Sequence, residues 1–347
     1  MSGKVLKSVQ DLAEAGLIDA ENRDALDAVA ARYAIAITPA IQALIDPADR
    51  EDPIAAQFVP QAEELTQTPL EQPDPIGDHA RSPVPGIVHR YPDRVLLKVL
   101  HTCPVYCRFC FRREMVGPQG DGSLSTQEVE AALGYIRSHT EIWEVIFTGG
   151  DPLILSPRRL QALVTALAGI EHVKIIRFHS RVPVVDPQRI DTALIDALTV
   201  SGKMTYVAIH ANHPRELTED ARQAVLRLRK AGIETISQTV LLKGVNDRVE
   251  VLAKLMRDFV ELGIRPYYLH HPDLAPGTSH FRLSLAEGQA LVAALRGHVS
   301  GLCQPLYILD IPGGYGKVPA AASPIEKTGD SYRITDFHGA THLYREN

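Results

Sequence analysis

From residue 94 onward, the sequence alternates between apolar runs of strand length and stretches with helical periodicity. The apolar runs cover 95–100, 145–148, 173–178, 204–209, 235–242, 266–269 and 306–309. The helical stretches cover 126–139, 157–169, 217–231, 249–262 and 284–298. Strands that alternate with helices pair in parallel through right-handed crossovers. The pattern therefore predicts an α/β fold, a partial (βα)6 TIM-like barrel whose chemistry lies on the loops that follow the strands.

The two ends of the chain lack this alternation. Residues 8–47 carry apolar side chains at helical spacing, which predicts an N-terminal helical extension. The segment 48–87 is rich in Pro, Gln, Asp and Glu and predicts an irregular wrapping segment, while alternation at 331–345 predicts a hairpin. We therefore expect N-terminal helices with the wrapping segment, then the barrel, then a tail, at 1–80, 81–320 and 321–347.

Composition limits the partners and the compartment. A chain of 347 residues that is 45% hydrophobic can bury one large core. Its net charge of -6 gives no general attraction to nucleic acids or anionic membranes. The sequence shows no signal-peptide pattern and no apolar run as long as a transmembrane helix, and it has only 4 cysteines. We expect a cytoplasmic protein with reduced thiols.

Three of these cysteines, Cys103, Cys107 and Cys110, lie together in the loop after the first predicted strand. Four thiolates would close a zinc site or ligate every iron of a [4Fe–4S] cluster, whereas three leave one iron open to bind another molecule. The alternative is a zinc site in a non-catalytic protein, with a fourth ligand from His101 or Cys303. Zinc ligands more often come as two separated pairs, which favours the cluster.

The C-x3-C-x2-C spacing, with Phe109 before the last cysteine, resembles the radical S-adenosylmethionine (SAM) superfamily. There the open iron binds the amino and carboxylate groups of SAM. After the second predicted strand, Gly149, Gly150 and Asp151 resemble the superfamily motif that meets the methionyl ammonium of SAM. A Gly-Gly-Asp sequence alone is also an ordinary turn. The resemblance implies a partial barrel of the radical SAM type.

A glycine-rich run ends at Lys317, in the sequence Asp-Ile-Pro-Gly-Gly-Tyr-Gly-Lys. It is not a nucleotide-binding P-loop, because Ile311 stands where the first glycine is required and Val318 replaces the Ser or Thr. A lysine on a loop of close backbone approach suits covalent binding of pyridoxal 5′-phosphate (PLP). The alternative is a solvated lysine on a turn.

Together, the cysteine loop, the Gly-Gly-Asp motif and the Pro-Gly-Gly-x-Gly-Lys run resemble the lysine 2,3-aminomutase family over roughly 80–320. The resemblance implies an isomerase that moves the α-amino group of L-lysine from C2 to C3, with a [4Fe–4S] cluster, SAM and PLP as cofactors. It also implies an electron donor such as flavodoxin or ferredoxin. Oligomeric state, product stereochemistry and the donor's identity stay open.

The resemblance also assigns contacts residue by residue. Arg90, Tyr91 and Arg94 would bind PLP or its phosphate, consistent with the ability of arginine to fork to phosphate oxygens. Gln238 and His210 would lie near SAM and PLP, although a barrel histidine is more often structural.

Three further residues would select the substrate. Arg112 would bind the α-carboxylate, and Asp273 and Asp310 would bind the ε-ammonium of lysine, because two carboxylates favour a cation and disfavour an acidic side chain. Each aspartate alone would more often be a loop or capping residue.

The chain departs from the family in two respects. No cysteine follows Cys303 and Arg248 follows the Gly-Val-Asn-Asp run, so the C-terminal zinc site of some members is not expected. The N-terminal part is short, as in the branch that serves elongation factor P, although the sequence around Lys317 leaves the branch undecided. The same reaction dedicated to elongation factor P, and an aminomutase for another amino acid, remain alternatives.

Overall fold

The computed structural model describes residues 3–19, 23–117 and 122–346. Its main sheet has nine strands whose spatial order follows the chain, β1 to β9. Strands β2 to β8 pair in parallel, and β1 and β9 close the two edges antiparallel. The strands are β1 Ile87–Tyr91, β2 Arg94–Leu100, β3 Glu144–Gly149, β4 Ile175–Ser180, β5 Met204–His210, β6 Glu234–Val240, β7 Arg265–His270, β8 Leu306–Ile311 and β9 Gly316–Pro319.

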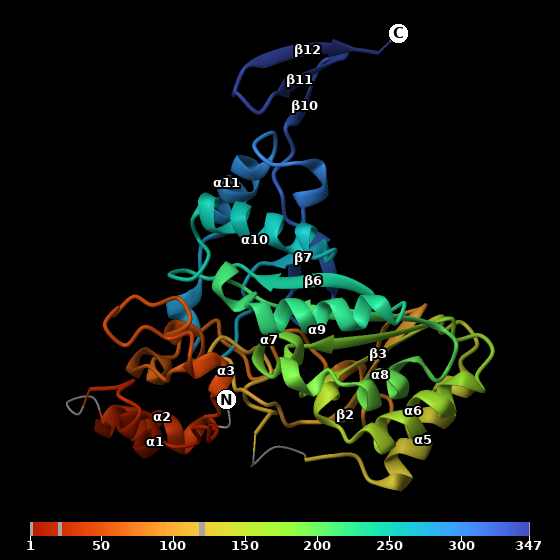
Figure 1. Ribbon diagram of the computed structural model, residues 1–347. Helices are drawn as coiled ribbons and strands as arrows, with labels where there is room; N and C mark the ends of the chain where they lie inside the picture. The colour runs from red at the N-terminus through yellow and green to blue at the C-terminus, as the bar shows by residue number, and fades with distance from the viewer. Residues whose placement is uncertain (1–2, 20–22, 118–121, 347) are drawn as a thin grey trace.

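Six helices follow successive parallel strands and run along the outer side of the sheet (Figure 1). They are α5 Thr126–Ser138, α6 Pro157–Ala168, α8 Thr192–Thr199, α9 Glu219–Lys230, α10 Val249–Glu261 and α11 Leu285–Leu295. In α10 the residues Leu252, Leu255, Met256 and Phe259 are buried, at the spacing of one helix face. The six strand–helix units and the last parallel strand confirm the predicted partial (βα)6 barrel.

Local sequence explains where these helices begin. Ser125 and Ser284 cap α5 and α11, and in both cases a glutamate three residues later accepts a hydrogen bond from the serine backbone amide. Such capping boxes satisfy amide groups that have no partner inside the helix. Most predicted boundaries of the barrel strands and helices agree with the structure to within two residues, and the largest difference is at the end of α11.

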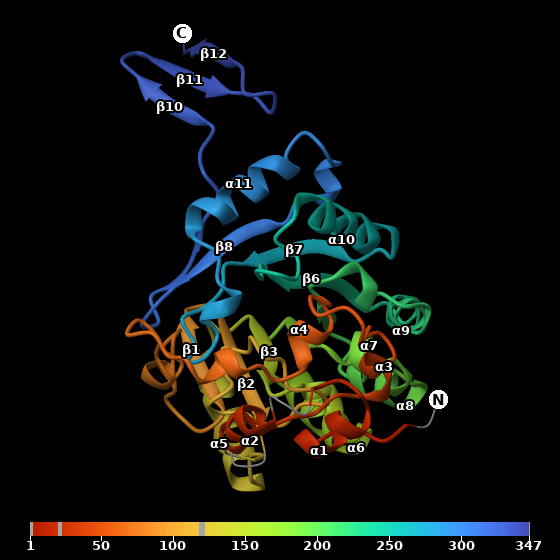
Figure 2. The ribbon, with the colours of Figure 1, turned by 90° about the vertical axis from the view of Figure 1, so that its left-hand side faces the viewer.

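The N-terminal segment packs against the barrel and shares its core (Figure 2). Its helices are short: α1 Val9–Glu14, α2 Arg23–Arg32, α3 Pro39–Gln42 and α4 Ala55–Phe58, followed by the 3-10 turns η2 Ala62–Leu65 and η3 His79–Arg81. Leu12, Ile37 and Phe58 are fully buried in the same apolar cluster as the barrel strands. The wrapping segment is therefore part of the folded body.

The tail forms a separate antiparallel sheet of three strands, which projects from the body (Figures 1 and 2). The strands are β10 Ile325–Thr328, β11 Ser331–Thr335 and β12 Thr341–Arg345, where the sequence predicted a hairpin. The Phe337 ring reaches back to His298, with ring centroids 5.9 Å apart. In the part of the chain that the structure describes, no helix is both long and apolar enough to cross a membrane.

Candidate active site

All the residues that the sequence predicted for cofactors and substrate line one cavity inside the barrel. They come from the edge strands β1 and β9, from the parallel strands themselves, and from the loops that follow those strands. Parallel strands bring the loops at their carboxyl ends to one side of the sheet, which is why residues far apart in sequence meet there. The shared set is Arg90, Tyr91, Arg94, Cys103, Cys107, Cys110, Arg112, Gly149, Gly150, Asp151, His210, Gln238, Asp273, Asp310 and Lys317.

The three loop cysteines are free, partly exposed thiols that face the cavity. Burial raises the pKa of Cys110 to about 11, with a contribution from Cys107, so the sulfur atoms influence one another. No three His, Cys, Asp or Glu side chains among the described residues are arranged to hold a single metal ion. Three thiolates that each bind a different iron of a cubane cluster need not converge on one point.

The two candidates for a fourth zinc ligand, Cys303 and His101, lie outside the cavity lining. Cys303 is buried in the 3-10 turn Gly301–Cys303, where its charged neighbours are Arg257 and Glu261. Neither Cys303 nor His101 is among the described residues that line the cavity. The geometry therefore presents three cysteines, without these two residues, to whatever binds in the cavity.

The two glycines at the end of β3, Gly149 and Gly150, allow a close approach to the cysteine loop. A Cβ atom on Gly150 would lie 2.2 Å from the carbonyl oxygen of Thr102, so a side chain there would collide with backbone. The amide of Asp151 donates to the same oxygen at 3.0 Å. The Asp151 carboxylate accepts hydrogen bonds from the Ser180 hydroxyl and the Arg181 amide, each at 2.7 Å, and so also fixes the loop after β4.

Arg181 contacts the cysteine loop directly. Its Nη1 lies 2.9 Å from the sulfur of Cys107, and its Nη2 donates to Glu216 and to Gln57, each at 2.6 Å. The guanidinium also stacks on Phe58 at 4.5 Å. The sequence analysis assigned no role to this arginine.

The Lys317 end of the cavity is built by pairing of β8 with β9. The antiparallel register places Asp310 directly opposite Lys317, whose Nζ lies 2.5 Å from Asp310 Oδ1. The Lys317 amide donates to the Tyr91 hydroxyl at 2.7 Å, and Arg94 stacks on the Tyr91 ring at 3.8 Å. The buried Nε atom of Arg90 has no protein partner. Two arginines, a phenol and a lysine therefore converge at this end.

Arg112 is held by a carboxylate that the sequence did not identify. Asp78 is buried between Arg112 at 2.9 Å, Arg90 at 3.1 Å and Lys98 at 3.8 Å. Burial opposes its ionisation, but the charges of Arg112 and Lys98 hold the pKa of Asp78 below its ordinary value. Asp78 lies within the irregular wrapping segment, so no spacing or motif in the sequence signalled it.

Asp273 and Asp310 form an acid pair with different protonation. Burial and the negative charge of Asp310 raise the pKa of Asp273 to about 7. Burial also opposes ionisation of Asp310, but the nearby His270 and Lys317 hold the pKa of Asp310 below its ordinary value. One member of the pair is therefore an anion at neutral pH, and the other titrates there.

A chain of polar contacts crosses the cavity wall to this pair. His210 Nε2 lies 2.9 Å from Gln238 Oε1, and Gln238 Nε2 lies 3.1 Å from His270 Nε2. His270 Nδ1 lies 3.6 Å from Asp310 Oδ2. The sequence had marked His210 and Gln238, but it had not marked His270.

Comparison with known proteins now defines the family. Residues 97–256 match the Radical SAM superfamily. The L-lysine 2,3-aminomutase of Clostridium subterminale is 40% identical over 313 residues, which is 90% of this chain and 75% of that protein. The chain belongs to the lysine 2,3-aminomutase family. It is therefore a radical SAM enzyme and an isomerase, and the predicted family, fold and enzyme class are confirmed. The family implies a [4Fe–4S] cluster and SAM.

Relatives within this family differ in their named substrates. The L-lysine 2,3-aminomutase of Fusobacterium nucleatum is 37% identical over 342 residues, covering 98% of this chain and 80% of that protein. The glutamate 2,3-aminomutase of Clostridioides difficile is 33% identical over 327 residues, covering 94% of this chain and 77% of that protein. Overall similarity alone therefore does not choose between lysine and glutamate, and the substrate has to be argued from the site.

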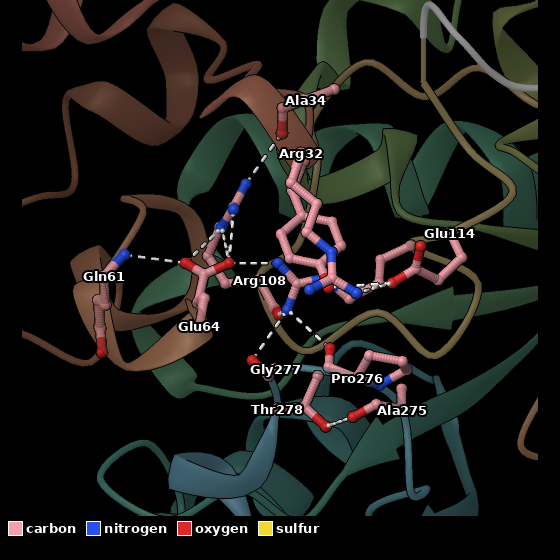
Figure 3. A network of polar contacts seen from close by, with 12 residues as sticks. Arg32, Ala34, Gln61, Glu64, Arg108, Glu114, Ala275, Pro276, Gly277 and Thr278 are labelled. Carbon is pink, nitrogen blue, oxygen red and sulfur yellow. Dashed lines mark hydrogen bonds and ion pairs between the residues drawn. The ribbon is translucent and has the colours of Figure 1, made fainter. Parts of the chain in front are cut away.

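A second buried carboxylate ties the cysteine loop of this aminomutase to its N-terminal segment (Figure 3). Glu64 in η2 accepts hydrogen bonds from Arg108 Nε, at 2.9 and 3.1 Å, and from Arg108 Nη2 at 2.5 Å, and is also paired with Arg113. Arg113 donates to the carbonyl of Gly277 at 3.0 Å. Both arginines lie in the cysteine loop, so the network anchors that loop to the wrapping segment and to the segment after β7.

Proposed function

We propose that this enzyme moves the α-amino group of L-lysine from C2 to C3 to give β-lysine, with a [4Fe–4S] cluster, SAM and PLP. The observation that carries the proposal is the pair Asp273 and Asp310 in the cavity that Arg112 also lines. Two acids and one arginine complement a molecule with an ammonium group and a carboxylate. A glutamate side chain would bring a second anion beside Asp310, which repulsion disfavours.

The residues present fit each cofactor. Cys103, Cys107 and Cys110 would hold the cluster and leave one iron for SAM. Arg90, with an unpaired buried Nε atom, and Arg94 offer donors for the phosphate of PLP. When bound, the cluster and SAM supply one-electron chemistry and PLP supplies a conjugated ring that stabilises the migrating nitrogen.

The protein's own side chains bind and orient. Lys317 would bind PLP covalently, and its ion pair with Asp310 would neutralise its ammonium while that amine is free. Arg112 is held rigidly by Asp78 but keeps Nη1 directed toward Thr148 in the cavity, so it can still meet a carboxylate. An electron donor of the flavodoxin or ferredoxin class would reduce the cluster.

The test is anaerobic turnover of the reconstituted enzyme with lysine, glutamate and arginine, followed by chromatography of the β-amino acid. We expect lysine to be preferred. The Asp310→Asn variant should lower kcat/KM for lysine by about tenfold or more, because a hydrogen bond to a charged group contributes roughly 1.5–3 kcal/mol. Preference for glutamate, or full activity of Asp310→Asn, would refute the lysine assignment.

PLP binding is tested separately by borohydride reduction and peptide mapping. We expect the pyridoxyl group on Lys317. If the pyridoxyl group appears on Lys243 or Lys327, the assignment of Lys317 as the PLP lysine is wrong, whichever amino acid is the substrate.

A further inference from the structure

We propose that His270 is a positioning and specificity-determining residue, which orients Asp310 toward the substrate's distal ammonium by presenting an N–H to Asp310 Oδ2. The inference rests on the proposed lysine substrate and adds a residue that the cofactor and substrate contacts above do not include. His270 lies on β7, between Gln238 on β6 and Asp310 on β8, and all three line the cavity.

The hydrogen-bonding groups around His270 determine which nitrogen carries its proton. Burial lowers the pKa of His270, and it lowers the pKa of His210 to about 3, so both rings are neutral and each has one N–H. Gln238 accepts through Oε1 from His210, which leaves its Nε2 amide to donate to His270 Nε2. His270 Nε2 is therefore an acceptor, and the proton must lie on Nδ1.

The nitrogen that carries this proton lies beside the carboxylate that would bind the substrate. Nδ1 lies 3.6 Å from Asp310 Oδ2, beyond hydrogen-bond length but close enough for a charge–dipole attraction. Asp310 Oδ1 faces the Lys317 ammonium. With one oxygen held toward His270, the other is directed at the cation, and the same orientation would serve a substrate ammonium.

The other groups around His270 and Asp310 lie on the neighbouring strands and in the loop after β7. On β9 the charged neighbour is Lys317. In the loop after β7 it is Asp273, whose pKa is also affected by the charges of Arg112 and Asp78. On β7 itself the Tyr268 ring packs edge-on against His270, with centroids 5.6 Å apart. In this set, His270 is the uncharged donor beside Asp310. Its removal should therefore lower the affinity of Asp310 for the substrate ammonium.

The experiment compares lysine with 2-aminohexanoate, which has the same chain without the ε-ammonium. The oxidised holoenzyme, which cannot turn over, is titrated with each amino acid while the PLP absorption band is followed. We expect His270→Phe to raise the Kd for lysine by about tenfold, since a misoriented partner weakens a charge-assisted contact, and to leave 2-aminohexanoate binding nearly unchanged. In turnover the change should fall on KM more than on kcat.

Two further variants separate positioning from packing. His270→Asn places an amide donor where the imidazole Nδ1 lies and should restore most of the lysine affinity. Gln238→Glu can only accept from His270, so it should move the proton to Nε2, turn a lone pair toward Asp310 and weaken lysine binding while His270 remains in place. Melting temperatures verify that each variant folds.

The matched control is His271→Phe. His271 is the next residue along the chain, hydrogen-bonds the Tyr307 hydroxyl at 2.7 Å and does not line the cavity, so lysine affinity should be unchanged. If wild type binds lysine no better than 2-aminohexanoate, the lysine assignment itself fails. If wild type is selective but folded His270→Phe or Gln238→Glu retains that selectivity, or if Asn rescues no better than Phe, the role of His270 is overturned.

Discussion

Asp273 and Asp310 are chemically identical residues, but their surroundings separate their pKa values. Burial and the charge of Asp310 raise the pKa of Asp273 to about 7, so this carboxyl titrates near neutrality. A bound ammonium favours its ionised form, and lysine binding should therefore release a proton. The lysine ε-ammonium, with an ordinary pKa of about 10.4, stays charged throughout. We expect lysine affinity to rise with pH, by up to about tenfold per unit below the pKa, and to level off above about pH 8.

The measurement is the pH dependence of lysine binding by wild type and by Asp273→Asn. The asparagine cannot ionise, so its profile between about pH 6 and 8 should be much flatter and its maximal affinity lower. A variant that keeps the full wild-type slope would show that another group controls the profile.

At the scale of elements, Glu64 joins the turn η2 to the cysteine loop. Removing one partner from a buried ion network costs roughly 3–5 kcal/mol, because the remaining charges stay buried without compensation. We expect Glu64→Gln, which leaves Arg108 and Arg113 facing a neutral amide, to lower the midpoint of guanidinium unfolding strongly. Glu63→Gln changes the exposed neighbour in the same turn and should alter stability by less than about 0.5 kcal/mol. Equal midpoints for the two variants would contradict an anchoring role for Glu64.

The elements also show what the sequence could predict. The seven parallel strands and five of the helices were predictable because each is a local apolar pattern, as in β5 and α10. The edge strand β9 was not, since four residues beginning at Gly316 carry no alternation and become a strand only by pairing with β8. Short helix α8 was missed between β4 and β5 for lack of a long periodic run.

Some residues of the candidate site could be predicted from the sequence, and others could not. Cysteines and glycine motifs are contiguous in sequence and could be read there, whereas Asp78 and His270 act through partners that only the fold brings near. Gln238 is 32 residues from His270. Asp78 is 34 residues from Arg112. No pattern within one segment encodes such pairs.

At the scale of the whole molecule, the tail sheet and the catalytic body are nearly independent. The residues of β10 and β12 are exposed, and the Phe337 ring is a point where the tail touches the body, near His298. Sites that share few contacts contribute independently to stability and function. We expect truncation after Ala322 to leave lysine turnover within about twofold of the full chain and to change the body's melting temperature little.

Truncation after Gly314 is the matched control: it removes β9 and Lys317, and should abolish PLP incorporation. Loss of turnover or solubility on truncation after Ala322 would instead show that the tail sheet is required by the active enzyme.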